Sequence, residues 1–320
     1  MLETSPSGSR LAPAHELGRS LKTGYGKRFG RKARLAFANK AFKRICIASA
    51  VFVCLILFLI LFFMGRTGIL TFAEVSPIEF FLSTDWAPEE GRYGILLFIF
   101  GTFALTGLTL LLSVPLSIAI AVFLAVMTPA WLRNALRPVM DLLVGIPSVV
   151  YGYLGLTLLI PLLRGLTGVS VADGLMAAAL VLTVMVLPTI SRISDDAISA
   201  VPKKYSDASY ALGGTRAQTV VKVLLPAARR GILYAVILGM ARAIGETMAV
   251  VMVIGNTPQL ADSLFKPTAV LTSNIVMQIS SVEFASTWNY ALYMMGFLLL
   301  VISIGMILAV RWLQKKGVQA

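Results

Sequence analysis

Five stretches of the chain run for about 20 residues without a charged side chain, which is the length that an α-helix needs to cross a bilayer. A sixth stretch, 231–255, is equally apolar but contains Arg242 and Glu246. Inside lipid only helices and closed barrels satisfy their backbone hydrogen bonds, and these stretches lack the alternation of barrel strands. We therefore predict an all-α integral membrane protein with six spans, at about 45–64, 95–127, 139–163, 174–191, 231–255 and 284–312.

The basic residues predict the orientation of these spans. If 95–127 is one long helix, with Pro115 as a place for a kink, 23 of the 28 Lys and Arg residues lie on one side. Four lie on the other side, and Arg242 lies inside a span. Splitting 95–127 into two spans would reverse every later loop and mix these charges. Because basic loops stay in the cytoplasm, we predict that both termini are cytoplasmic.

The chain divides into a basic tail, 1–44, and a six-helix transmembrane domain, 45–315, with a long cytoplasmic loop at about 200–230. The first span is too long for the core of a cleaved signal peptide, so we expect it to act as an anchor. A basic cluster at 24–32 is compatible with two roles. It either lies against anionic lipid headgroups or only sets the topology from solution.

Composition excludes several classes of function. A net charge of +13 would suit a nucleic-acid binder, but 58% hydrophobic residues leave little soluble surface to carry such a site. The single histidine, His15, lies in the polar tail, and Cys46 and Cys54 lie in an apolar stretch, so neither a metal site nor a disulfide framework is expected. Gly26-Lys27 lacks the earlier glycine of a Walker A loop. We expect no catalytic residue, no metal and no cofactor bound by this chain.

The long cytoplasmic loop has the pattern of a compact helical hairpin. It predicts a helix over 202–212, which Gly213 ends by adopting positive φ. A capping box from Thr215 to Gln218 then opens a second helix, which is predicted to end at Pro226. From physics alone the hairpin is either a docking element for a partner's groove or an interfacial link between two spans.

Two segments of this loop carry a resemblance to a known family. Asp-Ala-Ser-Tyr-Ala-Leu-Gly at 207–213 is followed, nine residues later, by Val-Leu-Leu-Pro at 223–226. This resembles the EAA loop of ABC-importer permeases, with Asp for Glu, Ser for the second Ala and Val for Ile. The resemblance implies a coupling helix that fits a groove of a cytoplasmic ATPase. The coupling residues that it implies are Asp207, Ala208, Ser209, Gly213, Leu225 and Pro226.

Three further segments are similar to phosphate-importer permeases of the PstC type: Gly-Ile-Pro-Ser-Val-Val-Tyr-Gly at 145–152, Arg-Ala-Ile-Gly-Glu-Thr-Met-Ala-Val at 242–250 and Ile-Gly-Asn-Thr-Pro at 254–258. The resemblance covers about 45–315 and implies the type I importer (MetI-like) fold in a bacterial cytoplasmic membrane. It also implies three kinds of partner. They are a homologous PstA-like permease subunit, a PstB-like ATPase dimer that uses ATP, and a PstS-like phosphate-binding protein outside the membrane.

Arg242 and Glu246 are the charges inside a predicted span. On one continuous helix, positions four apart share a face, so the pair is expected to neutralise itself. A central arginine is costly in lipid, so the pair should face the bundle interior or a water-filled path. We predict that Arg242 meets the anion and that Glu246 orients the arginine, or accepts a hydrogen bond from protonated phosphate. The alternative is a structural ion pair.

Four other polar residues are weaker candidates for the pathway. Asn256 and Thr257 follow the fifth predicted span and either line its outer mouth or cap the turn before Pro258. Ser148 and Tyr151 lie in the third predicted span and either line the pore or pack helices together.

Three functions remain in competition at this point. The first is a subunit of an ATP-driven phosphate importer, and the second is a permease for another oxyanion or small solute, since one arginine cannot distinguish phosphate from sulfate. The third is a non-conducting membrane scaffold, against which the charges at Arg242 and Glu246 argue. A membrane-embedded enzyme would need clustered nucleophiles, acids or metal ligands, and none is evident.

Overall fold

The computed structural model describes the backbone of residues 14–316, with the side chains of residue 40 and residues 42–312. The chain forms two units, one up to Phe62 and the other from Phe63 onward. Residues 1–13 of the predicted basic tail lie outside the described part of the chain.

The first unit consists of helix α1 (Ala14–Ile69) as far as Phe62. The predicted tail is therefore helical from Ala14 onward. Apolar side chains occupy every face of this helix after Ile45, and Phe58 and Phe62 stack one turn apart with their ring centroids 6.1 Å apart. A helix that is apolar all round belongs in an apolar surrounding, which agrees with a membrane span here.

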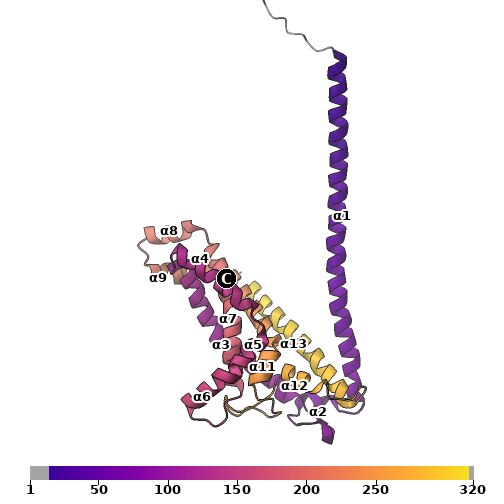
Figure 1. The fold of residues 1–320 in the computed structure, drawn as a ribbon, viewed down its shortest axis with the longest axis vertical. Helices are drawn as coiled ribbons and strands as arrows, with labels where there is room; N and C mark the ends of the chain where they lie inside the picture. Colours follow the sequence, from indigo (N-terminus) through magenta and orange to yellow (C-terminus); the bar gives the residue numbers. More distant parts are fainter. Residues whose placement is uncertain (1–13, 317–320) are drawn as a thin grey trace, which may run out of the picture. The chain divides into compact units, whose positions relative to one another are not determined.

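The second unit contains the remaining elements (Figure 1). Six helical stretches in the described chain are long and apolar enough to span a membrane, which confirms the predicted count. They are Phe42–Ala73, Leu96–Met127, Ser148–Thr167, Leu175–Ser199, Arg216–Gly245 and Thr287–Trp312.

The two ends of the second unit differ in charge. At one end, α4 (Ala130–Gly145), α8 (Lys203–Ala211) and α9 (Arg216–Thr219) lie together in Figure 1. We call this the basic end, and it is the end predicted to be cytoplasmic. At the other end lie short elements and the loops that connect them, and together they carry eight of the 13 acids of the unit, so we call it the acidic end. The short elements are η1 (Leu70–Ala73), α2 (Pro77–Leu82), β1 (Trp86–Ala87), η2 (Pro88–Glu90), β2 (Arg92–Tyr93) and α12 (Leu271–Gln278).

The second span is a single long helix, as predicted. α3 (Leu96–Val122) contains Pro115 and continues into a π-helical turn, η3 (Phe123–Met127). It packs most extensively on α7 (Leu175–Ser199). Hydroxyl groups cross this interface: Thr183 donates to the carbonyl of Thr109 at 3.5 Å, and Ser117 donates to that of Leu187 at 3.3 Å. Small polar residues let membrane helices approach closely and bond to one another.

The third span begins later than predicted. Instead of one helix over 139–163, α4 ends at Gly145, and the backbone is extended at Ile146 and Pro147, with ψ values of 129° and 138°. Proline has no N–H and disfavours helical conformation in the residue before it, so Pro147 separates two helices rather than kinking one. The span itself consists of α5 (Ser148–Leu154), η4 (Gly155–Leu159) and α6 (Ile160–Thr167).

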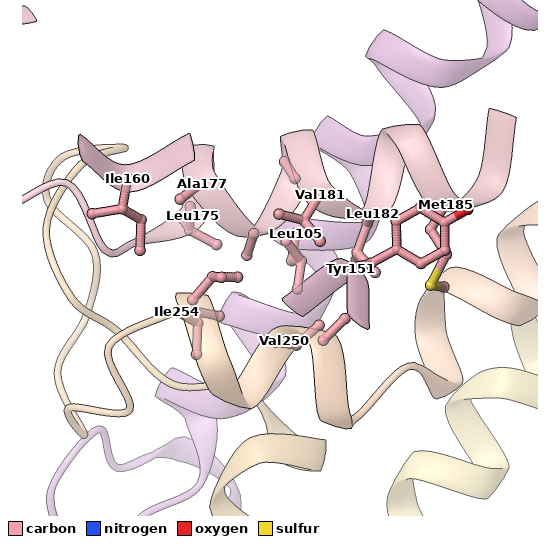
Figure 2. Close-up of a cluster of buried hydrophobic side chains, with 14 of the residues drawn as sticks. Leu105, Tyr151, Ile160, Leu175, Ala177, Val181, Leu182, Met185, Val250 and Ile254 are labelled. Atoms are coloured by element: carbon pink, nitrogen blue, oxygen red, sulfur yellow. The ribbon is translucent and has the colours of Figure 1, made fainter. Parts of the chain in front are cut away.

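A buried hydrophobic cluster joins α5 to α7 and to α11 (Met248–Val253) (Figure 2). Two glycines of the third span permit this contact. A Cβ at Gly152 would lie 2.9 Å from the Cα of Ala249, and one at Gly155 would lie 2.6 Å from Cγ2 of Val181. The last span, α13 (Thr287–Lys316), packs on α10 (Leu225–Gly245) and α12.

The substitution Gly152→Ala should destabilise the protein, because its methyl group would overlap the backbone of α11. Overpacking of this kind costs about 1–3 kcal/mol. Gly165→Ala is the matched control, since a Cβ there meets no atom within 4 Å. Thermal unfolding of both variants in the same detergent checks the prediction, and equal melting temperatures would contradict it.

Candidate functional site

Arg242 lies one turn before the end of α10 and joins three helices. Its Nη1 donates to Oγ1 of Thr189 on α7 at 3.1 Å, and its Nη2 donates to the carbonyl of Val144, near the end of α4, at 3.5 Å. The side chain is half-buried. The arginine is therefore held at the point where α4, α7 and α10 meet.

The predicted pairing of Arg242 with Glu246 is wrong. α10 ends at Gly245, and Glu246 has extended backbone, with φ −70° and ψ 130°, so the two residues do not share one helix. The Glu246 carboxylate turns instead to the start of α11, where Oε1 accepts from the backbone N–H groups of Thr247 at 3.2 Å and Ala249 at 3.3 Å. A helix begins with unpaired N–H groups, and a carboxylate is a suitable acceptor for them.

As a result, Arg242 keeps its charge uncompensated by a direct contact. Both of its acceptors are neutral, and no carboxylate of the described residues lies within 4.0 Å of its guanidinium. Neutral acceptors fix the orientation of the planar guanidinium group without cancelling its charge. An oriented cation inside a bundle of apolar helices attracts an anion strongly, because the surroundings screen it less than water does.

The two candidates in the third span differ in position. Tyr151 is buried in the cluster of Figure 2, and its hydroxyl donates to the carbonyl of Leu143 at 2.8 Å, which favours the packing role over the pore-lining role. Ser148 is half-buried in the first turn of α5, close in sequence to the break that ends α4.

Asn256 and Thr257 have the contacts of a turn cap. Nδ2 of Asn256 donates to the carbonyl of Val251 in α11 at 2.7 Å, and the hydroxyl of Thr257 donates to that of Gly255 at 3.3 Å. Gly255 and Asn256 both have positive φ, 88° and 50°. The structure therefore places these groups where they end a helix, as the second reading of the sequence proposed.

An ion pair that the sequence analysis missed fastens α4 to α7. Arg137 donates from Nε to Oδ2 of Asp195 at 2.8 Å and from Nη2 to Oδ1 at 3.0 Å, and Ser199 also donates to Oδ1 at 3.1 Å. The side chain of Asp195 is fully buried, and that of Arg137 is 27% exposed. The hydrogen bond to Asp195 raises the pKa of the Arg137 guanidinium. We call this pair the α4 clasp.

Arg192 extends the clasp. Its guanidinium lies 3.3 Å from Asp141 on α4, 3.6 Å from Asp195 and 2.5 Å from Asp196. The two acids follow Arg192 by three and four positions, a spacing that brings charges together on a helix. That spacing is visible in the sequence, but the partner on α4 is not, because Arg137 lies 58 positions before Asp195.

The predicted hairpin at the basic end is present. Gly213 has a φ of 78° after α8. The capping box is also confirmed: Gln218 N–H donates to Oγ1 of Thr215 at 3.3 Å, and Thr215 N–H donates to Oε1 of Gln218 at 2.9 Å. Of the proposed coupling residues, Asp207 and Ala208 are exposed, and the hydroxyl of Ser209 lies 2.8 Å from that of Thr219, joining α8 to α9.

The second helix of this hairpin does not end at Pro226, contrary to the prediction. It continues from α9 through a π-helical turn, η5 (Val220–Leu224), directly into α10, so that Leu225 and Pro226 begin α10 and lie inside the span Arg216–Gly245. A proline inside a continuous helix removes one backbone hydrogen bond, and Pro226 stands directly after the π-helical turn. One unbroken helical path thus runs from Arg216, just after the turn that follows the proposed coupling helix α8, to the helix that carries Arg242.

Two arginines cap the basic end of the second span. Arg133 of α4 donates to the carbonyls of Leu124 at 2.8 Å and Ala125 at 3.0 Å, and Arg216 of α9 donates to that of Val126 at 2.5 Å. The last carbonyls of a helix have no partner within it, and basic side chains satisfy them well. The hairpin is therefore attached to α3 as well as to α10.

Comparison with known proteins agrees with this architecture. Residues 113–317 match the family described as binding-protein-dependent transport system inner membrane component. The chain belongs to this family. It is 46% identical to the probable ABC transporter permease protein YqgH of Bacillus subtilis over 79% of this chain and 84% of that protein. It is 32% identical to the phosphate transport system permease protein PstC of Xylella fastidiosa over 88% of this chain and 92% of that one.

A solved structure supports the fold of this permease. It is the crystal structure of a bacterial ABC transporter involved in the import of the acidic polysaccharide alginate. The similarity covers 87% of this chain and 98% of that one, with a TM-score of 0.59 and 15% sequence identity. The predicted type I importer fold is confirmed. Family membership makes the chain a membrane-embedded, multi-pass permease subunit rather than an enzyme, and it implies an ATPase and a substrate-binding protein as partners.

The α4 clasp of this permease should be important for stability. Arg137→Met would leave the buried Asp195 carboxylate without its two strongest donors, and removing one partner of a buried pair costs about 3–5 kcal/mol. Arg229→Met is the control, because Arg229 is exposed and has no hydrogen bond or ion pair among the described residues. Thermal unfolding in detergent checks this.

The double variant Arg137→Met/Asp195→Leu should recover part of the loss, because it also removes the stranded charge. An Arg137→Met protein as stable as the Arg229→Met protein would show that the clasp does not hold α4.

Proposed function

We propose that this chain is the PstC-like transmembrane subunit of an ATP-driven importer that carries inorganic phosphate across the bacterial cytoplasmic membrane. The observation that carries the proposal is Arg242, a half-buried guanidinium oriented by two neutral acceptors with no carboxylate at contact distance. Relatives named as PstC permeases support phosphate as the substrate, at 32% identity in Xylella fastidiosa and 36% in Haemophilus influenzae.

The guanidinium offers a planar set of N–H donors that matches two oxygens of a phosphate. Two of its nitrogens rest on Thr189 and Val144, and these neutral acceptors are easily exchanged for a charged one. An arriving anion therefore exchanges weak hydrogen bonds for charge-assisted ones. Conduction also needs release, and the same two acceptors are in place to take the guanidinium back when the anion leaves.

Glu246 has a different role from the one expected from the sequence. Its side chain holds the start of α11, and its backbone carbonyl accepts from the hydroxyl of Thr272 in α12 at 3.2 Å. In this proposal it keeps the helix broken next to Arg242. The break leaves the arginine at the end of α10, and Glu246 keeps its negative charge away from the guanidinium.

The proposal includes three kinds of partner. A homologous PstA-like subunit completes the pathway, a PstB-like ATPase dimer supplies ATP hydrolysis, and a PstS-like protein delivers phosphate. The chain itself binds no cofactor in this scheme. The ATPase contacts α8 and its flanking turn, including Asp207, Ala208, Ser209 and Gly213, and the linkage through α9 and η5 carries the movement to Leu225, Pro226 and α10.

The substitution Arg242→Gln should lower phosphate uptake by at least tenfold in liposomes that contain the complete importer, because it removes the charge that attracts the anion. Arg242→Lys keeps the charge but loses the planar fork, so it should recover only part of the uptake. Arg229→Gln, on an exposed arginine of the same helix, is the control. Uptake of radiolabelled phosphate at matched protein levels is the measurement.

Sulfate uptake is measured in parallel, since the permease YqgH is named without a substrate. An importer that moves sulfate but not phosphate would contradict the substrate and leave the architecture intact. If the Arg242→Gln importer instead took up phosphate at the wild-type rate, Arg242 would not be part of the transport pathway.

A further inference from the structure

The acidic end contains a hollow that no part of the proposed transport path uses. It has a volume of about 260 Å³ and lies between the β1–β2 hairpin, the loop after α11 and the α12–α13 region. Its lining includes Trp86, Glu89, Glu90, Pro258, Gln278 and Trp288.

Two tryptophans form fixed walls of this hollow. Trp86 is 6% exposed and meets the rings of Tyr93 and Phe98 edge to face, at centroid distances of 5.9 Å and 5.4 Å. Trp288 is held by a hydrogen bond from Nε1 to Oε1 of Gln278 at 2.8 Å. The faces of such rings attract cations, most strongly for tryptophan.

The rim of the hollow carries a negative charge that is only partly balanced. Arg92 pairs with both Asp85 and Glu90. The neighbouring Glu89 is exposed and has no ion pair among the described residues. Three acids thus share one arginine around the hairpin, and the hollow combines aromatic walls with an unpaired carboxylate.

This charge excludes the free anion as the natural occupant. Phosphate approaching within a Debye length, about 8 Å at physiological salt, would be repelled by the rim. A bare metal ion does not fit either, because the described residues contain no group of three or more His, Cys, Asp or Glu side chains placed to hold one. The chemistry that remains is an organic cation, such as an ammonium or guanidinium group.

The position of the hollow indicates where that cation comes from. Pro258 lines it and directly follows Asn256 and Thr257, at the outer end of the α10–α11 segment that carries Arg242. The family to which the chain belongs is described as binding-protein-dependent, so the surface of a protein that carries basic side chains is the source that this position indicates.

We propose that the hollow receives a lysine or arginine side chain from the importer's external substrate-binding protein. This rests on the proposed function, which places the acidic end outside the membrane. Docking there would set the binding protein next to the outer end of the path to Arg242. The acidic rim then selects a basic protein surface while repelling free anions, so that phosphate enters only from a docked protein.

The test uses the complete importer in nanodiscs and, as the probe, the purified phosphate-binding protein of the same organism loaded with phosphate. Glu89→Gln and Trp288→Leu should each weaken its equilibrium binding about three- to tenfold, in the range of one ion pair or cation–π contact. Glu79→Gln is the control, because Glu79 is an exposed acid of α2 that does not line the hollow. Salt should weaken wild-type binding more steeply than that of Glu89→Gln.

Unchanged affinity in both the Glu89→Gln and Trp288→Leu importers would overturn the inference. Binding of methylguanidinium, a free organic cation, is measured with the same variants. If they lose this binding but hold the binding protein as tightly as wild type, the hollow takes a free cation and the inference is also overturned. Phosphate uptake by the wild-type importer is measured in the same preparation. Binding without uptake contradicts the proposed function, whereas normal uptake with unchanged variant affinities contradicts only the docking site.

Discussion

A backbone inside a bilayer must satisfy its own hydrogen bonds, and at two breaks in the described helices of this permease side chains take over that task. At the break after α10, the Glu246 carboxylate accepts from two N–H groups of α11. At the end of α4, Tyr151 and Arg242 donate to the carbonyls of Leu143 and Val144. The first break is closed by its own residue Glu246 and by the hydroxyl of Thr272 from α12, and the second also uses Arg242 from α10. The arrangement of the helices therefore depends on both local and distant contacts.

The same constraint connects the site to the rest of the bundle. α4 is attached to α7 by the bidentate pair of Arg137 and Asp195, and to α3 by the contacts of Arg133. The far end of α4 supplies the carbonyl that orients Arg242. A movement of the hairpin at the basic end therefore has two structural routes to the arginine, one through η5 and α10 and one through α3 and α4.

Charge divides the second unit in a way that suits an anion carrier with a protein partner. The predicted cytoplasmic end is basic, the opposite end is acidic, and one arginine remains inside without a carboxylate at contact distance. An acidic mouth is a poor entrance for a free anion and a good surface for a basic protein. The family to which the chain belongs is described as binding-protein-dependent. The division of charge and the family description therefore both favour a protein partner at the acidic end.

The sequence by itself determined the number of spans, the helical hairpin at the basic end, its glycine turn at Gly213 and the capping box at Thr215. These features depend on local properties, namely the length of an apolar run, the freedom of glycine and hydrogen bonds between residues three apart. The sequence also singled out Arg242, because a charge within an apolar run is conspicuous.

Only the tertiary structure decided which groups these residues meet. It broke the helix at Glu246, separated α4 from the third span at Pro147 and carried the hairpin helix on through Pro226. It also joined Arg137 to Asp195 across 58 positions. Whether a chain can leave the helix inside a membrane depends in part on donors and acceptors from distant segments, here Thr272 and Arg242. Neither periodicity nor spacing along the chain records where those segments lie.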